Sequence, residues 1–244
     1  MISIIIPLFN EEENAKRYPQ TLFPMVEPIL KQYNETAEYV LVDDGSRDTT
    51  LAVLNTLKAT YQNVVVAPHG INKGLGVAIR TGLSHSHGDL VVMLDADLTY
   101  RPQDIAKLLA AYRDTGADCI SGSPYMEKEH TSEISSPFRI FISKSSSFLY
   151  RKLLRDDLTC VSGIFRLYKK EALDSLTLES NNYEIFAEII AKLILNGKDV
   201  REIGVKLHTR VYGESKLNVK KEVINNLRIL CKIFKSRYLG RKWN

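Results

Sequence analysis

The segment Asp95-Ala96-Asp97 carries the sharpest chemical signal in the sequence. Two carboxylates one residue apart, directly after an apolar run, can both turn toward a single cation if the backbone bends there. Hard divalent ions such as Mg²⁺ or Mn²⁺ prefer such oxygens and complete their coordination shell with substrate phosphates. The alternative is that one aspartate caps the following helix and the other is solvated. Asp95 and Asp97 are therefore candidate metal ligands.

A second acidic segment, Asp43-Asp44-Gly45-Ser46, follows another apolar run. One of its carboxylates could accept a hydrogen bond from a base N–H or a ribose hydroxyl. The same residues also suit a turn from a strand into a helix, with Asp48 as the N-cap. Gly74-Leu75-Gly76 lacks the third glycine of a dinucleotide motif, since Ile79 occupies that position. A nicotinamide-binding fold is therefore disfavoured, and these glycines suggest tight helix packing.

The segment 183–196 is apolar nearly all round, except for a polar row of Glu184, Glu188 and Lys192. This row is either an exposed stripe stabilised by pairing of Glu188 with Lys192, or a sign that Glu188 projects into a cleft as a base or acceptor-positioning group. Farther along, the segment 210–216 combines Arg210 and Lys216 with a glycine and a serine. It is either a solvated loop or a basic loop that closes on a diphosphate.

The elements that must position these residues alternate along the first half of the chain. Apolar, β-branched runs and helical spacings predict strands at residues 2–6, 39–42, 64–67, 90–94, 164–168 and 200–205, and helices at residues 21–32, 48–60, 74–83, 102–112, 138–154, 183–195 and 219–238. This order indicates an α/β protein with a mostly parallel sheet flanked by helices. Ligands bind beyond the carboxyl ends of such strands, so the acidic segments should converge on one rim.

Charge is divided unevenly along the 244 residues, whose net charge is +4. The last 29 residues, from Lys216, hold nine basic residues and one acidic residue and so carry +8, which leaves −4 on the rest. Such a split indicates a localised anionic contact rather than a coating of nucleic acid. The residues 219–238 form an amphipathic helix suited to an anionic membrane surface, although such a helix could also pack on the body.

Other classes of protein are disfavoured by simple counts. No apolar run reaches the roughly 18 residues of a membrane span. The three cysteines are odd in number and far apart, so neither a disulfide framework nor a zinc site is indicated, and a reducing cytoplasm is expected. We expect one α/β domain over residues 1–217, followed by the basic amphipathic helix in residues 218–244.

Taken in order, these motifs resemble the family-2 glycosyltransferases of the GT-A (Rossmann-like) fold. The likeness is greatest to the branch of dolichol-phosphate mannose synthases and polyprenyl-phosphate glycosyltransferases. The matching segments are residues 4–11, 42–48, 72–74, 95–98, 163–166 and 210–217. Two positions depart from the pattern: Thr99 stands where a glutamine is common, and Pro124 stands where an arginine often follows the fifth strand.

The resemblance implies a role for each matching residue. Five residues would hold the nucleoside, namely Pro7, Phe9, Glu11, Leu41 and Asp43. Asp95 and Asp97 would carry Mg²⁺ or Mn²⁺ and the diphosphate, with the Ala96 backbone close by. Arg210 and Lys216 would bind phosphates.

These roles imply an inverting hexosyltransferase that uses a GDP- or UDP-hexose donor, a polyprenyl phosphate acceptor and a divalent metal. Asp97 and Arg210 would act in catalysis, and basic residues of the segment 138–154, such as Arg139, could receive the lipid phosphate. One alternative is transfer to a sugar or protein hydroxyl, which needs a base, and Glu188 or an aspartate is the candidate. Another is a catalytically weak nucleotide-sugar-binding protein. In each case the expected location is cytoplasmic, with peripheral contact at the cytoplasmic face of a membrane.

Overall fold

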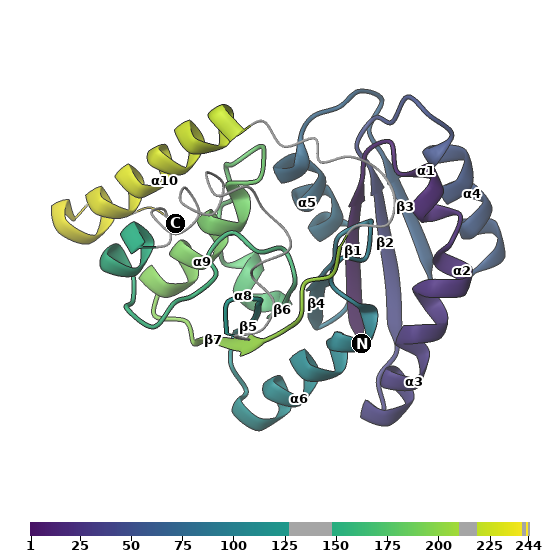
Figure 1. Cartoon of the computed structure of the whole chain (residues 1–244), viewed down its shortest axis with the longest axis horizontal. Coiled ribbons are helices and arrows are strands. Elements are labelled where there is room, and N and C mark those ends of the chain that lie inside the picture. Colours follow the sequence, from purple (N-terminus) through teal and green to yellow (C-terminus); the bar gives the residue numbers. More distant parts are fainter. Residues whose placement is uncertain (127–147, 210–218, 241–242, 244) are drawn as a thin grey trace.

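A computed structural model describes residues 1–126, 148–209, 219–240 and 243. Within these residues, one sheet has the strand order β3-β2-β1-β4-β6-β5-β7 (Figure 1). Its strands are β1 (Ile2–Leu8), β2 (Ala37–Asp43), β3 (Val64–Pro68), β4 (Leu90–Met93), β5 (Cys119–Ser123), β6 (Arg166–Lys169) and β7 (Val200–Gly204). Only β6 runs against its neighbours, β4 and β5. The α/β class with a mostly parallel sheet is therefore confirmed.

The register of the first strands explains how the acidic segments meet. Leu8 at the end of β1 pairs with Asp43 at the end of β2, and Ile5 pairs with Met93 at the end of β4. The three strands therefore finish at the same edge of the sheet. The residues that follow each strand lie beyond that edge, as the sequence predicted.

Helices cover both faces of the sheet (Figure 1). They are α1 (Glu12–Ala15), α2 (Tyr18–Thr21), α3 (Phe23–Tyr33), α4 (Thr50–Thr60), α5 (Leu75–Ser84), η1 (Pro102–Asp104), α6 (Ile105–Thr115), α8 (Lys170–Asp174), α9 (Ile185–Leu195) and α10 (Val219–Leu239). Phe23 of α3 packs on Tyr39 of β2. Gly82 of α5 lies against Val42, whose side chain points to the opposite face of the same strand.

Most of the predicted helices and strands are present with boundaries shifted by one to three residues. The strand expected at 164–168 begins at Arg166, and the helix expected at 21–32 begins at Phe23, after two short helices. The short strand β5 was not indicated by periodicity. Of the helix expected at 138–154, residues 138–147 lie outside the described residues, and residues 148–153 are helical.

The terminal helix α10 packs on α9 through one apolar face that includes Ile229, Leu230 and Ile233. Its polar residue Asn225 is also buried and donates to Glu184 at 3.1 Å. Packing on the body, which the sequence left as an alternative, is therefore present. Among the described helices, none is long and apolar enough to cross a membrane.

Candidate active site

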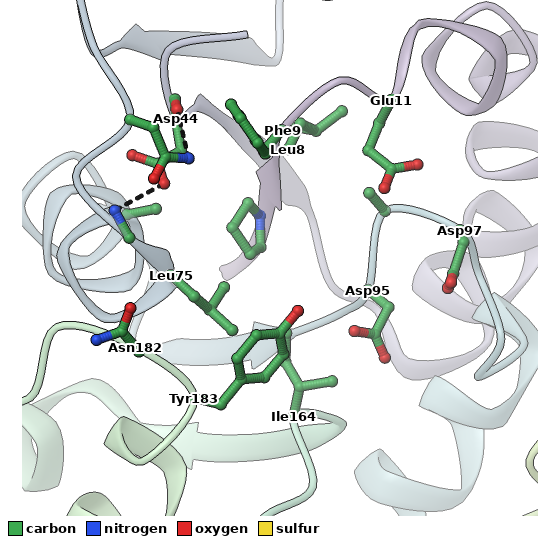
Figure 2. Close-up of a pocket in the computed structure, with 15 residues that line it drawn as sticks. Leu8, Phe9, Glu11, Asp44, Leu75, Asp95, Asp97, Ile164, Asn182 and Tyr183 are labelled. Carbon is green, nitrogen blue, oxygen red and sulfur yellow. Dashed lines mark hydrogen bonds between the residues drawn. The ribbon is translucent and has the colours of Figure 1, made fainter. Parts of the chain in front are cut away.

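A cavity of about 230 Å³ opens at the carboxyl edge of the sheet (Figure 2). The ends of β1, β2 and β4 contribute to its wall, together with the start of α5 and two segments from the second half of the chain. The lining residues are Pro7, Leu8, Phe9, Glu11, Asp44, Asn72, Gly74, Leu75, Ala78, Asp95, Ala96, Asp97, Ile164, Asn182 and Tyr183. The predicted convergence on one rim is confirmed.

The two aspartates after β4 are turned by an unusual backbone bend. Leu98 has φ +54°, which is uncommon for a residue with a side chain. Its N–H donates to the carbonyl of Asp95 at 3.2 Å, and the N–H of Thr99 donates to the Asp97 carboxylate at 3.0 Å. The backbone therefore bends shortly after β4, and the carboxylate of Asp97 helps to close this turn.

Negative charge gathers around the buried Tyr18. Its hydroxyl donates to the carbonyl of Ala96 at 3.0 Å. Burial raises the pKa of Tyr18 well above its usual value, and the charges of Glu11, Asp97 and Asp95 raise this pKa further. In Figure 2 these three carboxylates lie toward one end of the cavity. This acidic corner is suited to a cation and a diphosphate.

The donor set at this corner fits a hard divalent ion. Among the described residues, no group of three or more His, Cys, Asp or Glu side chains could hold a metal. Mg²⁺ usually keeps several waters and is held by one or two carboxylates plus substrate phosphates. Asp95 and Asp97, which both line the cavity, provide that smaller set.

The structure corrects the choice between Asp43, the last residue of β2, and Asp44, which follows it. Asp43 is buried, and its carboxylate accepts the N–H of Ser46 at 3.3 Å, so it closes the turn. Asp44 instead lines the cavity. Leu41 is also fully buried within β2 and is absent from the wall, whereas Pro7, Phe9 and Glu11 are part of it.

Asp44 is held by the turn that follows β3. Its carboxylate accepts the N–H groups of Lys73 at 2.8 Å and Gly74 at 2.9 Å. This turn approaches Gly45 so closely that a Cβ atom there would lie 2.2 Å from the carbonyl carbon of Ile71. Gly45, which also has φ +70°, is therefore required for the close approach.

Glu188 does not project into the cavity, so its predicted role as a base is corrected. Glu188 and Lys192 are both fully buried, which also rules out an exposed stripe. Their pairing is confirmed at 2.9 Å. The carboxylate of Glu188 also accepts the N–H groups of Glu179 and Ser180 at 3.0 and 2.8 Å. Because its oxygens bind groups in the protein interior, Glu188 holds the loop at Glu179 and Ser180 in place and does not position an acceptor substrate.

That loop places Asn182 and Tyr183 in the cavity wall. On its other side, the N–H of Gly76 donates to the carbonyl of Asn181 at 2.9 Å. A Cβ atom at Gly76 would lie 2.2 Å from the carbonyl oxygen of Ser180. The tight packing predicted for the glycines is thus present, but their partner is this loop. The sequence did not indicate that Asn182 and Tyr183 line the cavity, because only the fold brings them there.

The remaining predicted residues are divided between described and undescribed parts of the chain. Arg139, Arg210 and Lys216 lie outside the described residues. Thr99 is tied into the acidic turn, and its carbonyl accepts the N–H of His208 at 2.9 Å. Pro124 directly follows β5, as the resemblance implied.

A mixed sheet whose carboxyl edge carries a cavity lined by two neighbouring aspartates has the features expected of a nucleotide-dependent transferase of the GT-A type. The sequence profile of Glycosyl transferase family 2 matches residues 3–177, and the chain belongs to this family. It is similar to a dolichol-phosphate mannosyltransferase of Pyrococcus furiosus, with 34% identity over 239 residues. That match covers 96% of this chain but only 64% of the relative, so the chain spans less than two thirds of that protein.

Solved structures confirm the fold. A glucosyl-3-phosphoglycerate synthase from Mycobacterium tuberculosis, in complex with Mn²⁺, UDP and glucosyl-3-phosphoglycerate, superposes with a TM-score of 0.67 at 15% identity. The match covers 96% of this chain and 79% of that one. The same enzyme with Mn²⁺, UDP-glucose and phosphoglyceric acid gives a TM-score of 0.68 over the same shares of the two chains. At this identity the likeness concerns the GT-A fold alone.

Proposed function

We propose that the protein transfers a hexose from a GDP- or UDP-hexose to a polyprenyl phosphate, with inversion at C1. The observation that carries this proposal is the single cavity bounded by Asp44 toward one end and by Asp95 and Asp97 toward the other (Figure 2). A nucleoside would bind near Asp44, Pro7 and Phe9, and its diphosphate would extend toward the acidic corner.

The choice of acceptor is supported by two further observations. The relative that is 34% identical is a dolichol-phosphate mannosyltransferase. The alternative, a hydroxyl acceptor, would need a general base, and Glu188, one of the candidates for it, is fully buried and paired. A lipid phosphate is already an anionic nucleophile, so it needs no strong base.

Each described residue at the acidic corner would have a distinct task. Mg²⁺ or Mn²⁺ held by Asp95 and Asp97 would neutralise charge on the leaving diphosphate. The N–H of Thr99 fixes the orientation of Asp97, and the hydroxyl of Tyr18 fixes the carbonyl of Ala96. Phosphate binding by Arg210 and Lys216 stays a prediction from the family resemblance.

We further propose that the protein lies at the cytoplasmic face of a membrane, with α10 as the peripheral contact. Its face opposite α9 exposes Ile224, Leu227, Phe234 and Tyr238. An apolar groove runs between α10 and the helix at 148–153, lined by Leu149, Leu153, Leu227, Leu230, Cys231, Phe234, Lys235 and Leu239. This apolar surface with basic neighbours suits an anionic lipid surface.

The direct test is incubation with a panel of nucleotide sugars and a polyprenyl phosphate, read by mass spectrometry of the extracted lipid. We expect one hexose to be added to the lipid in the presence of Mg²⁺ or Mn²⁺. Parallel arms contain a free sugar, a peptide and a phosphoglycerate as acceptors. Product in one of those arms, with none on the lipid, would overturn the proposed acceptor.

A further inference from the structure

His69 lies directly behind the cavity wall. It follows β3, and its backbone N–H donates to the carbonyl of Asp43 at 2.7 Å. The residue is 7% exposed, and its ring touches Asp44 and Thr81. Nδ1 is 2.7 Å from Oδ1 of Asp44, and Nε2 is 2.9 Å from the hydroxyl of Thr81 on α5. The ring therefore links the end of β2 to α5 through the end of β3.

The chemistry of the partners fixes the orientation of this ring. An ionised carboxylate can only accept hydrogen bonds, so Nδ1 of His69 must carry a proton. The hydroxyl of Thr81 can donate or accept, so it satisfies Nε2 in either protonation state of the ring. With a partner at each nitrogen, the ring has one favourable orientation, and that orientation holds Asp44.

The two oxygens of Asp44 are used unequally. Oδ1 accepts from Nδ1 of His69 and from the N–H of Lys73, which occupies both of its lone pairs. Among the described contacts, Oδ2 accepts only the N–H of Gly74. Asp44 is 4% exposed yet lines the cavity. Oδ2 therefore keeps one acceptor position for a ligand.

We propose that His69 is a positioning residue that sets Asp44 to accept the ring N–H of the donor's base. Uracil carries such an N–H at N3 and guanine at N1, whereas cytosine and adenine present a ring lone pair at the corresponding atom. The site therefore selects a uridine or guanosine diphosphate sugar over a cytidine or adenosine one. This inference rests on the proposed function and adds His69 as a residue that determines which bases the donor can carry.

The test uses isothermal titration of the full chain with UDP and GDP in the presence of Mn²⁺. The matched probes are N3-methyl-UDP and N1-methyl-GDP, which keep the diphosphate but lack the ring N–H. We expect His69→Phe to weaken binding of the unmethylated nucleotide about tenfold, the scale of a hydrogen bond to a charged group. Binding of the methylated partner should stay unchanged.

Three further variants separate positioning from a structural role. His69→Gln keeps a side-chain N–H donor and should recover most of the affinity. Thr81→Val removes only the outer link and should cause the same selective loss at about two- to threefold. His87→Phe is the control, because His87 is exposed and pairs with Glu38 instead.

Each outcome separates this inference from the proposed function. If the wild-type protein binds no nucleoside diphosphate with Mn²⁺, the proposed function fails. If it binds but His69→Phe binds equally well, or loses methylated and unmethylated nucleotides alike, only the role of His69 fails. If thermal melting shows that His69→Phe does not fold, the selective loss in Thr81→Val decides.

Discussion

Glu188 and Lys192 form an ion pair at 2.9 Å in which both side chains are 0% exposed. They are one turn apart on α9, and Lys192 also donates to the carbonyl of Thr177. The pair therefore holds both ends of the segment that leads to Asn182 and Tyr183. A catalytic base needs access to its substrate, whereas this carboxylate is committed to the backbone of Glu179 and Ser180.

Breaking this pair should lower the free energy of unfolding, whereas kcat should change little. Glu188→Gln leaves a buried ammonium without its counter-charge, so we expect a loss of about 3 kcal/mol in the free energy of unfolding. The double change Glu188→Gln with Lys192→Met removes both charges and should cost less than the sum of the single changes. Urea denaturation of the two single variants and the double variant measures this coupling.

Kinetics of the folded Glu188→Gln variant test the same assignment. Because the loop carries cavity residues, we expect KM for the donor to rise while kcat stays within a few fold. A fall of kcat by about a hundredfold or more, with KM unchanged, would instead indicate a base. That result would restore the hydroxyl-acceptor alternative.

Replacing either aspartate of the acidic corner should nearly abolish turnover. We expect Asp95→Asn or Asp97→Asn to lower kcat by at least about a hundredfold, because each weakens the charge stabilisation of the leaving diphosphate. Asp156→Asn is a matched control, since Asp156 is exposed, pairs with Lys152 and does not line the cavity. Near-normal turnover of either variant would contradict the metal role. Near-normal turnover of the wild-type protein in chelated buffer would contradict it as well.

The residues at the carboxyl edge of the sheet could be predicted because the strands that lead to it are apolar and easily identified. Ile2, Ile4, Ile5 and Ile6 are all buried, as a β-branched run in a covered strand should be. Parallel order then follows from the helices between the strands. The sequence alone therefore places the residues after β1, β2 and β4 at one edge.

The strand β5 could not be predicted, because it contains polar residues. These residues can be buried only because they form hydrogen bonds with residues that are distant in the sequence. Ser121 accepts a hydrogen bond from the buried Arg166 at 2.9 Å, and Ser123 bonds Thr159 at 2.6 Å. Asp43 and Asp44 pose a similar problem, because they are neighbours of the same residue type. Asp43 closes the turn, whereas Asp44 lines the cavity. Only the backbone path separates such neighbours.

The exposed face of α10 should control binding to lipid vesicles. Leu227 and Phe234 are 52% and 48% exposed, so Phe234→Glu should weaken binding to anionic vesicles without unfolding the chain. Deletion of the whole helix is a poorer test, because Ile229 and Ile233 belong to the core. Co-sedimentation with vesicles, paired with thermal melting, measures both effects.

A half-buried position on the same helix provides a control for this experiment. Ser236→Glu adds the same charge to α10, but Ser236 does not line the apolar groove. We therefore expect its vesicle binding to fall less than that of Phe234→Glu. Equal losses would show that added charge, and not the apolar face, governs the contact.

The three cysteines should differ sharply in their reaction with a thiol reagent at pH 8. Burial raises the pKa of Cys119 to about 12 and also raises the pKa of Cys160, so both remain neutral thiols shielded from solvent. Cys231 is exposed and lines the apolar groove. We expect one thiol to react rapidly in the native protein and three after unfolding.

Anionic vesicles extend this labelling into a test of orientation. If the groove meets lipid, vesicles should slow the reaction of Cys231 several-fold, and the Phe234→Glu variant should show less protection. The variant Cys231→Ser should show no rapid phase, which confirms the assignment of that phase. Full reactivity of Cys231 on vesicles that bind the protein would place the membrane contact on another surface.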